Sequence, residues 1–523
     1  MVTLAQVLPV QRQISALAAL ADVYRYPVAH AAPPGAKATE LNPEFFGALT
    51  EAFCQVFPVH RMLSGTEVPV SCGGGAGRGL ASTLPGCGKL AVVYAGNRYL
   101  DVRETGTLGQ VSDLYVPRIV DGLLDELLLS FPAISLVGPR AAGKTTTAVR
   151  RGGTVLRMDR PEVRQSVAAS PDAMLAGLRP PVILDEWQEV PELLGAVKRS
   201  VDEDPSPGRY ILTGSVRAEL ENQVWPGTGR LLQIPMYGMS VREVRGRASL
   251  TPFIDRVLDG GPDTVTAPDD ALSVRDYLDL MLAGSFPEPS LRMPAAARRR
   301  WFAGYVEQMI TRDVPAVAPR RDPELLRRYL SVLAVNTAGI AAESTLWSAA
   351  GINAKTAQAY QALFQRMFVL DLVPAWFSNR IKRLVKAPKR YLVDPALVTA
   401  VLGLGRDAIL YGPDMLGRLL DTFVAAQLRA ELAASSNDPR LYHLREEQGR
   451  REVDLVIETA SGQLIGIEIK AAATVTASDA RHLTWLRDQT GDAFAAGIVL
   501  HTGPHVFPVS DRIVAAPVST LWS

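Results

Sequence analysis

The chain has 523 residues, of which 47% are hydrophobic and 21% are charged, and this composition fits several folded domains rather than wholesale disorder. Its 55 Lys and Arg residues nearly balance 54 Asp and Glu residues, so a net charge of +1 excludes a polybasic nucleic-acid coat over the whole chain. Three cysteines and six histidines lie at no metal-ligand spacing, and neither a signal peptide nor a membrane-spanning apolar run is evident, so we expect a cytoplasmic protein with no membrane partner.

Residues 1–112 differ in composition from the rest of the chain and read as an N-terminal extension that is partly of low complexity. Two stretches within it have the pattern of ordered structure. The apolar spacing of 14–26 predicts a helix, and 90–102 predicts a pair of strands joined at Gly96-Asn97. We predict no chemistry for this region.

Residues 113–245 alternate between strand and helix patterns. A helix is predicted over 120–131, where Pro132 ends it, and continuous apolar runs predict buried strands, which are 133–138, 154–159, 181–186 and 210–215. Strands alternating with helices at this spacing indicate a parallel α/β sheet.

A phosphate-binding loop follows the first of these strands. The sequence from Gly138 to Thr145 fits G-x-x-x-x-G-K-[ST] at every fixed position and lies between a strand and a helix. Its backbone N–H groups would surround phosphate oxygens, with Lys144 adding a positive charge and Thr145 ligating Mg²⁺. The predicted ATP-binding residues are Gly138, Pro139, Arg140, Ala141, Ala142, Gly143, Lys144, Thr145 and Thr146.

Acidic and hydroxyl residues end the neighbouring strands. Asp185 is predicted to hold the magnesium ion, and Glu186 to orient the attacking water, although a purely structural carboxylate is the alternative. Thr213 ends the strand 210–215 and could contact the γ-phosphate or the water. Arg230 is either an arginine finger or a solvated loop residue. No guanine-specificity motif is present, which favours ATP over GTP.

The middle of the chain has a helical pattern. Residues 246–324 read as a helical linker, and 325–390 as a winged helix whose recognition helix is 352–367. A segment with six cations and no acid follows that helix, and its residues 380–390 could contact phosphates of DNA or RNA. The alternatives are a solvated face or a winged helix that contacts protein.

Residues 391–523 mix strands and helices and carry a D…E-x-K pattern. Glu468 and Lys470 lie on one face of a predicted strand, where Asp454 of the neighbouring strand can meet them. Two carboxylates there would bind Mg²⁺, and Lys470 would act on a water. Such restriction-endonuclease-like domains often draw another acid from a preceding helix, which here is Asp421 on 414–433.

In order along the chain, these motifs resemble prokaryotic ATPases with an AAA-type domain followed by the domain DUF4143. The similarity covers residues 113–523 and rests on several motifs, which are YVPRIVDGLLDELL, SLVGPRAAGKTT, ILDEWQEV, YILTGS, AGSFPEP, YVEQMITRDV, KAPKRYLVDPAL, GRLLDTFVAAQLRAEL, REVDLVIETASGQLIGIEIKA and PVSTLW. The resemblance implies a P-loop ATPase core, a helical linker, a winged helix and a C-terminal nuclease-like α/β domain. Two positions depart from the family pattern, since its usual Glu residues are Asp421 and Gln427 here.

Together these features predict a magnesium-dependent ATPase that couples its nucleotide state to the winged helix and nuclease-like domain on a nucleic acid. The alternative is a nucleotide-gated module that recruits a protein partner and carries an inactive nuclease-like domain. A homo-oligomer is compatible with both.

Overall fold

The computed structural model describes residues 91–95, 98–102, 115–215, 229–267, 272–318, 321–446 and 449–523. The chain divides into two compact units, Met1–Val116 and Pro117–Ser523. In the first, β1 (Ala91–Ala95) and β2 (Arg98–Val102) pair antiparallel, which confirms the predicted strand pair. The helix predicted over 14–26 and the low-complexity sequence lie outside the described residues.

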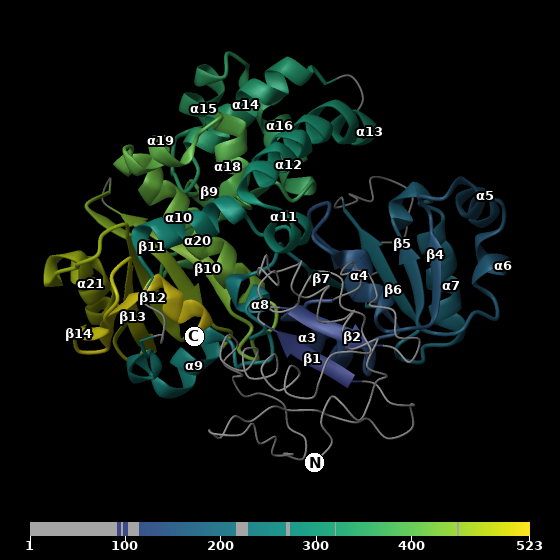
Figure 1. Cartoon of the computed structure of the whole chain (residues 1–523), viewed down its shortest axis with the longest axis horizontal. Coiled ribbons are helices and arrows are strands. Elements are labelled where there is room, and N and C mark those ends of the chain that lie inside the picture. The colour runs from purple at the N-terminus through teal and green to yellow at the C-terminus, as the bar shows by residue number, and fades with distance from the viewer. Residues whose placement is uncertain are drawn as a thin grey trace, which may run out of the picture. The chain divides into compact units, whose positions relative to one another are not determined.

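The second unit begins with a five-stranded sheet in which every neighbouring pair is parallel, in the order β4-β5-β6-β3-β7 (Figure 1). This confirms the predicted parallel sheet, which fits a P-loop ATPase core. Its strands are β3 (Ala133–Val137), β4 (Thr154–Arg157), β5 (Val182–Asp185), β6 (Tyr210–Gly214) and β7 (Leu231–Pro235).

Helices cover both faces of this sheet, as continuous apolar strands require. One face packs against α3 and α4, and the other against α5, α6 and α7. The predicted helix 120–131 ends three residues early, at Leu128. The bounds are α3 (Val120–Leu128), α4 (Lys144–Val149), α5 (Pro161–Ala169), α6 (Pro171–Leu175), the 3-10 helix η4 (Trp187–Glu189) and α7 (Leu193–Glu203).

A helical region follows β7. Capping boxes at Ser240 and Ser273 fix the beginnings of two of its helices. A π-helical turn interrupts the helical run near its end. The elements are α8 (Val241–Val244), α9 (Phe253–Gly260), η5 (Pro262–Thr264), α10 (Val274–Ala283), α11 (Pro287–Arg292), α12 (Ala295–Gln308), the π-helix η6 (Met309–Asp313) and α13 (Val314–Val317).

The region predicted as a winged helix contains three helices and then two antiparallel strands. Gly339, between the first two helices, forms an isolated bridge with Arg390 of the second strand. The elements are α14 (Pro323–Val335), α15 (Glu343–Ala349), α16 (Ala354–Arg366), β8 (Leu370–Val373), α17 (Arg380–Val385) and β9 (Lys389–Leu392).

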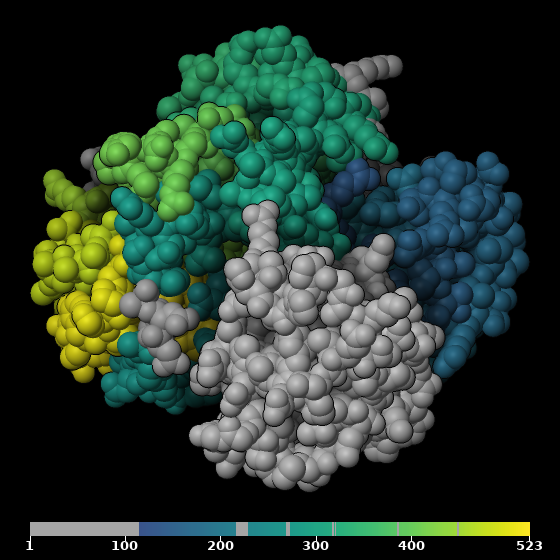
Figure 2. All heavy atoms as spheres, in the orientation of Figure 1, coloured from purple at the N-terminus to yellow at the C-terminus, as the bar shows by residue number. Residues whose placement is uncertain are grey.

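A separate six-stranded mixed sheet, in the order β10-β11-β12-β13-β15-β14, forms the C-terminal part. Helix α20 packs on one face and α21 on the other, and Figure 2 shows the teal residues of α9 directly beside the yellow C-terminal residues. The bounds are α18 (Pro395–Leu402), α19 (Arg406–Leu410), α20 (Pro413–Leu432), β10 (Arg440–Glu446), β11 (Arg451–Glu458), β12 (Leu464–Lys470), η8 (Ala477–Ala480), α21 (Arg481–Thr490), η9 (Gly491–Ala493), β13 (Phe494–His501), β14 (Phe507–Ser510), β15 (Ile513–Pro517) and η10 (Val518–Trp522).

One continuous apolar core extends from Val241 in the helical region to Trp522 at the C-terminus. The helical region, the three-helix region and one face of the C-terminal sheet all contribute to it, so these parts fold against one another. Among the described residues, none of the helices combines the length and the apolar composition needed to cross a bilayer.

Candidate functional site

The predicted phosphate loop connects β3 to α4. A Cβ atom at Gly138 would lie 1.9 Å from the carbonyl oxygen of Met236, so no larger residue fits there. Gly143 has a φ of 95°, a left-handed conformation that glycine adopts without strain. These two glycines therefore give the motif the tight path that the sequence pattern predicts.

Lys144 lies inside this loop. Its Nζ donates to the carbonyl oxygens of Gly138 at 3.0 Å and of Pro139 at 2.8 Å. Burial lowers the pKa of Lys144 to about 8, against the opposing effect of the Glu186 and Asp185 carboxylates. The ammonium thus occupies the centre of the loop, where phosphate oxygens could replace the two carbonyls as its acceptors.

Asp185, Thr145 and Thr213 meet at the carboxyl edge of the sheet. Asp185 Oδ1 accepts hydrogen bonds from Thr145 Oγ1 at 2.6 Å and from Thr213 Oγ1 at 2.5 Å. The register of β5 and β6 explains this meeting, because it aligns Asp185 with Thr213. A carboxylate and hydroxyls are the hard oxygen ligands that Mg²⁺ prefers, so these residues fit the ion that the motif implies.

Glu186 directly follows β5, in a left-handed conformation with a φ of 53°. Its Oε2 accepts hydrogen bonds from Gln188 Nε2 and, at 3.5 Å, from Ser215 Oγ. Gln188 Oε1 is buried without a hydrogen-bond partner among the described residues, as is Trp187 Nε1. Buried polar atoms without partners are uncommon, so their grouping beside Glu186 is consistent with a site that takes up a polar ligand or water.

The structure does not support the arginine-finger role for Arg230 on its own phosphate loop. Arg230 precedes β7, whose Leu231 pairs with Ala133 at the beginning of β3. The phosphate loop begins at the other end of β3, after five strand residues, which span roughly 16 Å. Arg230 instead forms an ion pair with Asp202, also at that opposite edge.

Arg118 supports the loop from the other side, and the sequence motifs did not predict this role. It is 6% exposed and donates to the carbonyl oxygens of Ala142 at 2.8 Å and of Tyr237 at 2.9 Å. It also pairs with Glu243 at 3.0 Å, and Glu243 belongs to the capping box of α8. Its presence in YVPR, just before α3, is the sequence signal that could have identified it.

The helical region contacts the phosphate loop directly. Arg140 of the loop forms an ion pair with Asp313 of η6, and the Tyr305 hydroxyl donates to the Arg140 carbonyl at 3.3 Å. Pro287 comes from the motif AGSFPEP and lies 3.5 Å from the position of a Cβ atom on Gly143. Residues far apart in the sequence therefore meet at the loop.

Two side chains of α20 connect the ATPase part to the C-terminal part. On helix α20, Gln427 Oε1 accepts from the backbone N–H of Val241 at 2.7 Å. One turn later, Glu431 accepts from Arg242 at 2.5 Å and from the N–H of Phe253 at 2.7 Å. Gln427 and Glu431 are buried, so α20 is fixed to the segment that follows the ATPase sheet.

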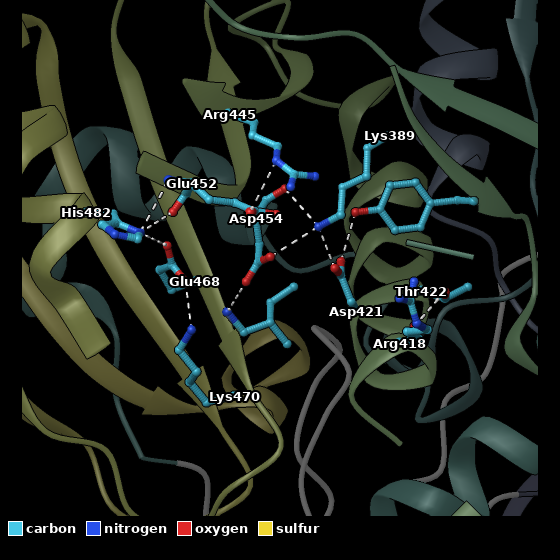
Figure 3. A network of polar contacts seen from close by, with 12 residues as sticks. Lys389, Arg418, Asp421, Thr422, Arg445, Glu452, Asp454, Glu468, Lys470 and His482 are labelled. Carbon is cyan, nitrogen blue, oxygen red and sulfur yellow. Dashed lines mark hydrogen bonds and ion pairs between the residues drawn. The ribbon is translucent and has the colours of Figure 1, made fainter. Parts of the chain in front are cut away.

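Two of the three predicted carboxylates of the C-terminal domain, Asp421 and Asp454, flank a lysine (Figure 3). Lys389 Nζ contacts Asp421 Oδ2 at 2.5 Å and Asp454 Oδ1 at 3.2 Å. Burial raises the pKa of Asp421 to about 6, although Lys389 opposes the rise. For Asp454, burial also favours the neutral acid, but the positive charge of Lys389 lowers its pKa below the usual value. The structure thus places an ammonium group between the two carboxylates.

Glu468 and Lys470 interact with each other, as Figure 3 shows. Lys470 Nζ donates to Glu468 Oε2 at 2.9 Å, and His482 Nδ1 lies 3.9 Å from Glu468 Oε1. Burial and the nearby Asp454 carboxylate raise the pKa of Glu468 to about 8. The structure brings the D…E-x-K residues near one another but divides their polar contacts into two groups, and Glu468 Oε1 is buried without a hydrogen-bond partner among the described residues. In the part of the chain that the structure describes, no three His, Cys, Asp or Glu residues are placed to hold a metal ion.

The basic segment differs from its prediction. Three of its six cations have internal partners: Arg383 pairs with Glu458 at 2.9 Å, Arg390 with Glu343 at 2.9 Å, and Lys389 with the carboxylates already described. Lys389 and Arg390 are fully buried. These three side chains are therefore not available to phosphates. The side chains that remain exposed are Arg380, Lys382 and Lys386.

Comparisons with known proteins agree with this geometry. Family models match the AAA domain (AAA_14) at residues 130–245, a domain of unknown function (DUF8612) at 274–408 and another (DUF4143) at 416–521. The uncharacterised proteins Rv2008c of Mycobacterium tuberculosis and Mb2031c of Mycobacterium bovis are each 30% identical over 396 residues, which cover 75% of this chain and 81% of theirs. The chain belongs to the AAA_14/DUF4143 family of AAA-type P-loop ATPases.

A solved structure is also similar to this member of the AAA_14/DUF4143 family. It is the Walker-type ATPase PABY2304 of Pyrococcus abyssi, which is 15% identical and aligns with a TM-score of 0.33 over 58% of this chain and 97% of the other. At the level of the family, membership indicates nucleotide binding and ATP hydrolysis.

Proposed function

We propose that this chain is a magnesium-dependent ATPase whose nucleotide state is transmitted to a C-terminal part that acts through protein contacts. The ATPase proposal rests on one observation: the hydroxyls of Thr145 and Thr213 both donate to one carboxylate oxygen of Asp185. This group lies beside Lys144 of the phosphate loop. Bound Mg²⁺ would be held by Thr145 and Asp185 and would neutralise charge that develops on the phosphates.

The side chains of the chain have separate tasks in this proposal. Lys144 exchanges its two carbonyl acceptors for phosphate oxygens of ATP, which orients the nucleotide in the loop. Glu186 orients the attacking water and accepts its proton, at the position where Ser215 and Gln188 hold its carboxylate. Thr213 keeps Asp185 in the orientation that faces Thr145.

The contacts around Arg140 support transmission of the nucleotide state. The same loop residue that would approach phosphates is paired with Asp313 and contacted by Tyr305, both outside the ATPase sheet. Phosphate binding would compete with Asp313 for the Arg140 guanidinium. The helical region shares an apolar core with the C-terminal sheet, so a shift in the first would reach the second.

The observations favour a protein partner over a nucleic acid. The exposed residues at the beginning of α16, the recognition-helix candidate, include a single cation, Lys355. The chain between β8 and β9 is joined to the C-terminal sheet, since Trp376 N–H donates to the His443 carbonyl at 2.6 Å. A wing held in this way, with half of its cations paired internally, offers few phosphate contacts.

The deciding experiment is ATP turnover by Glu186→Gln. We expect turnover to fall by about 10²- to 10⁴-fold while ATP binding, measured by calorimetry, is kept, because the amide cannot take the proton. The matched control is Glu189→Gln on the same turn, where Glu189 forms an exposed pair with Arg164, and this variant should keep its turnover. Equal turnover in wild type and Glu186→Gln would contradict the assignment.

Turnover measured with added duplex DNA or RNA separates the two kinds of partner. We expect no stimulation by either. Stimulation that disappears in a Lys355→Ala/Lys382→Ala variant would establish the nucleic-acid reading in place of the protein partner.

A further inference from the structure

The carboxylate cluster of the C-terminal domain already contains a cation. The Lys389 ammonium has three acceptors, which are Asp421 Oδ2 at 2.5 Å, Asp454 Oδ1 at 3.2 Å and the Asp454 carbonyl oxygen at 3.3 Å. An ammonium group has three protons to donate. Its hydrogen-bonding capacity is therefore used completely within the cluster.

The remaining carboxylate oxygens are also occupied. Tyr391 OH donates to Asp421 Oδ1 at 2.8 Å, and the N–H of Ile469 donates to Asp454 Oδ2 at 3.0 Å. Each of the four oxygens of Asp421 and Asp454 thus accepts one hydrogen bond. The network joins β9, α20, β11 and β12 and gives every oxygen of the two carboxylates a hydrogen-bond donor (Figure 3).

We propose that Lys389 is the resident cation of Asp421 and Asp454 and takes the place that a divalent ion bound to both carboxylates would need, so this pair is a structural ion cluster rather than a metal centre. A divalent ion would have to bind the same oxygens at about 2.0–2.6 Å. The ammonium already lies against those oxygens, and two cations cannot share them without strong repulsion.

Displacement of Lys389 by a metal ion is opposed by where the lysine lies. Lys389 is the first residue of β9, where it pairs with Val373 of β8, and its side chain is only 2% exposed. The departing ammonium would have to lose both carboxylates while it remains in the interior. A buried charge without a partner is far more costly than a paired one, so the lysine remains in place.

The test measures binding of Mn²⁺, used as the probe ion, to the full chain without nucleotide. The background carries Asp185→Asn, which removes the acid of the ATP site. Free Mn²⁺ is followed by its electron paramagnetic resonance signal. The background is compared with itself carrying Asp454→Asn, Lys389→Met, or both, and circular dichroism checks that each variant is folded.

We expect Asp454→Asn to leave Mn²⁺ binding by the background unchanged, because no metal depends on that carboxylate. Lys389→Met should gain about one Mn²⁺ per chain, and the added Asp454→Asn should remove it. A second readout is nicking of supercoiled plasmid with Mn²⁺, which should show no dependence on Asp454.

Two results would overturn the proposal. One is a Mn²⁺ site in the background that Asp454→Asn abolishes, since a metal would then displace the lysine. The other is a folded Lys389→Met variant that gains no site. If Lys389→Met does not fold, the comparison of the background with its Asp454→Asn variant decides alone. The ATP site plays no part in these measurements, so the outcome is separate from that of the proposed ATPase activity.

Discussion

Replacing Arg118 with methionine tests whether a buried arginine supports the phosphate loop. Met keeps much of the apolar stem of the side chain but removes the guanidinium. The loss releases the carbonyl oxygens of Ala142, Tyr237 and Gly238, and it leaves Glu243 without its positive partner. Because Ala142 is part of the phosphate loop, loosening should appear first in residues 138–149.

The size of the effect follows from the burial of the pair. Side chains of Arg118 and Glu243 are 5% and 2% exposed, and removing one partner of such a pair costs about 3–5 kcal/mol. Glu243 keeps two backbone donors, Ile119 N–H and Ser240 N–H, both at 2.7 Å, which favours the lower end. We therefore expect a loss of about 3 kcal/mol, or roughly a hundredfold in the local opening equilibrium.

Hydrogen exchange of the full chain measures this locally, since a chain with several domains need not unfold in one step. Arg199→Met is the control, because its ion pair with Asp172 is exposed at both ends and should leave exchange at the loop unchanged. Adding Glu243→Gln to Arg118→Met should restore part of the protection by removing the stranded charge. Exchange at 138–149 that stays within about threefold of wild type would refute the reasoning.

Two further expectations concern pH and coupling. Burial is the main cause that lowers the pKa of His443 to about 4, and the positive charges of Lys389 and Arg445 lower it further. The Asp454 carboxylate opposes this shift more weakly. The unfolded chain takes up this proton near pH 6.5, so the free energy of unfolding should fall by at most about 3 kcal/mol as the pH drops from 6.5 to 4. The urea midpoint of His443→Gln should therefore decline less steeply over this pH range than that of the wild type. Asp313→Asn breaks the ion pair with Arg140, whose side chain is half exposed, so ATP affinity should change by less than about fivefold. Any protection of 305–318 from hydrogen exchange that ATP induces should weaken in this variant. Full protection in the variant would argue against the coupling route.

The ATPase sheet could be predicted because its signals are local. Runs such as ISLV and VILD are apolar throughout, as strands buried on both faces must be, and the glycines of the phosphate loop stand at fixed spacing. The register then brings Asp185 to Thr213 without further information, since both end neighbouring parallel strands. Arg230 could not be judged in this way, because the sequence does not show that β7 runs parallel to β3, and that direction decides at which edge of the sheet Arg230 lies.

Charge could not be interpreted from local sequence, and residues 380–390 show the reason. A run of cations without acids predicts a solvated or phosphate-binding face only if no acid arrives from elsewhere. Here Arg383 is paired across 75 residues and Arg390 across 47. The partners come from β11 and from α15, whose approach is fixed by the apolar core and not by the charges themselves.

The departure at Gln427 follows the same logic. A residue on the same helix as Asp421 suggests a metal ligand or a base when the family pattern has a carboxylate there. In the fold its Oε1 is needed only as an acceptor for the Val241 N–H, and it is 7% exposed. A neutral amide satisfies that donor without the cost of burying a second charge one turn before Glu431. The position therefore serves the junction between the ATPase part and α20. Gln427→Glu should make the stability of that junction depend more strongly on pH, and it should not create a metal ligand.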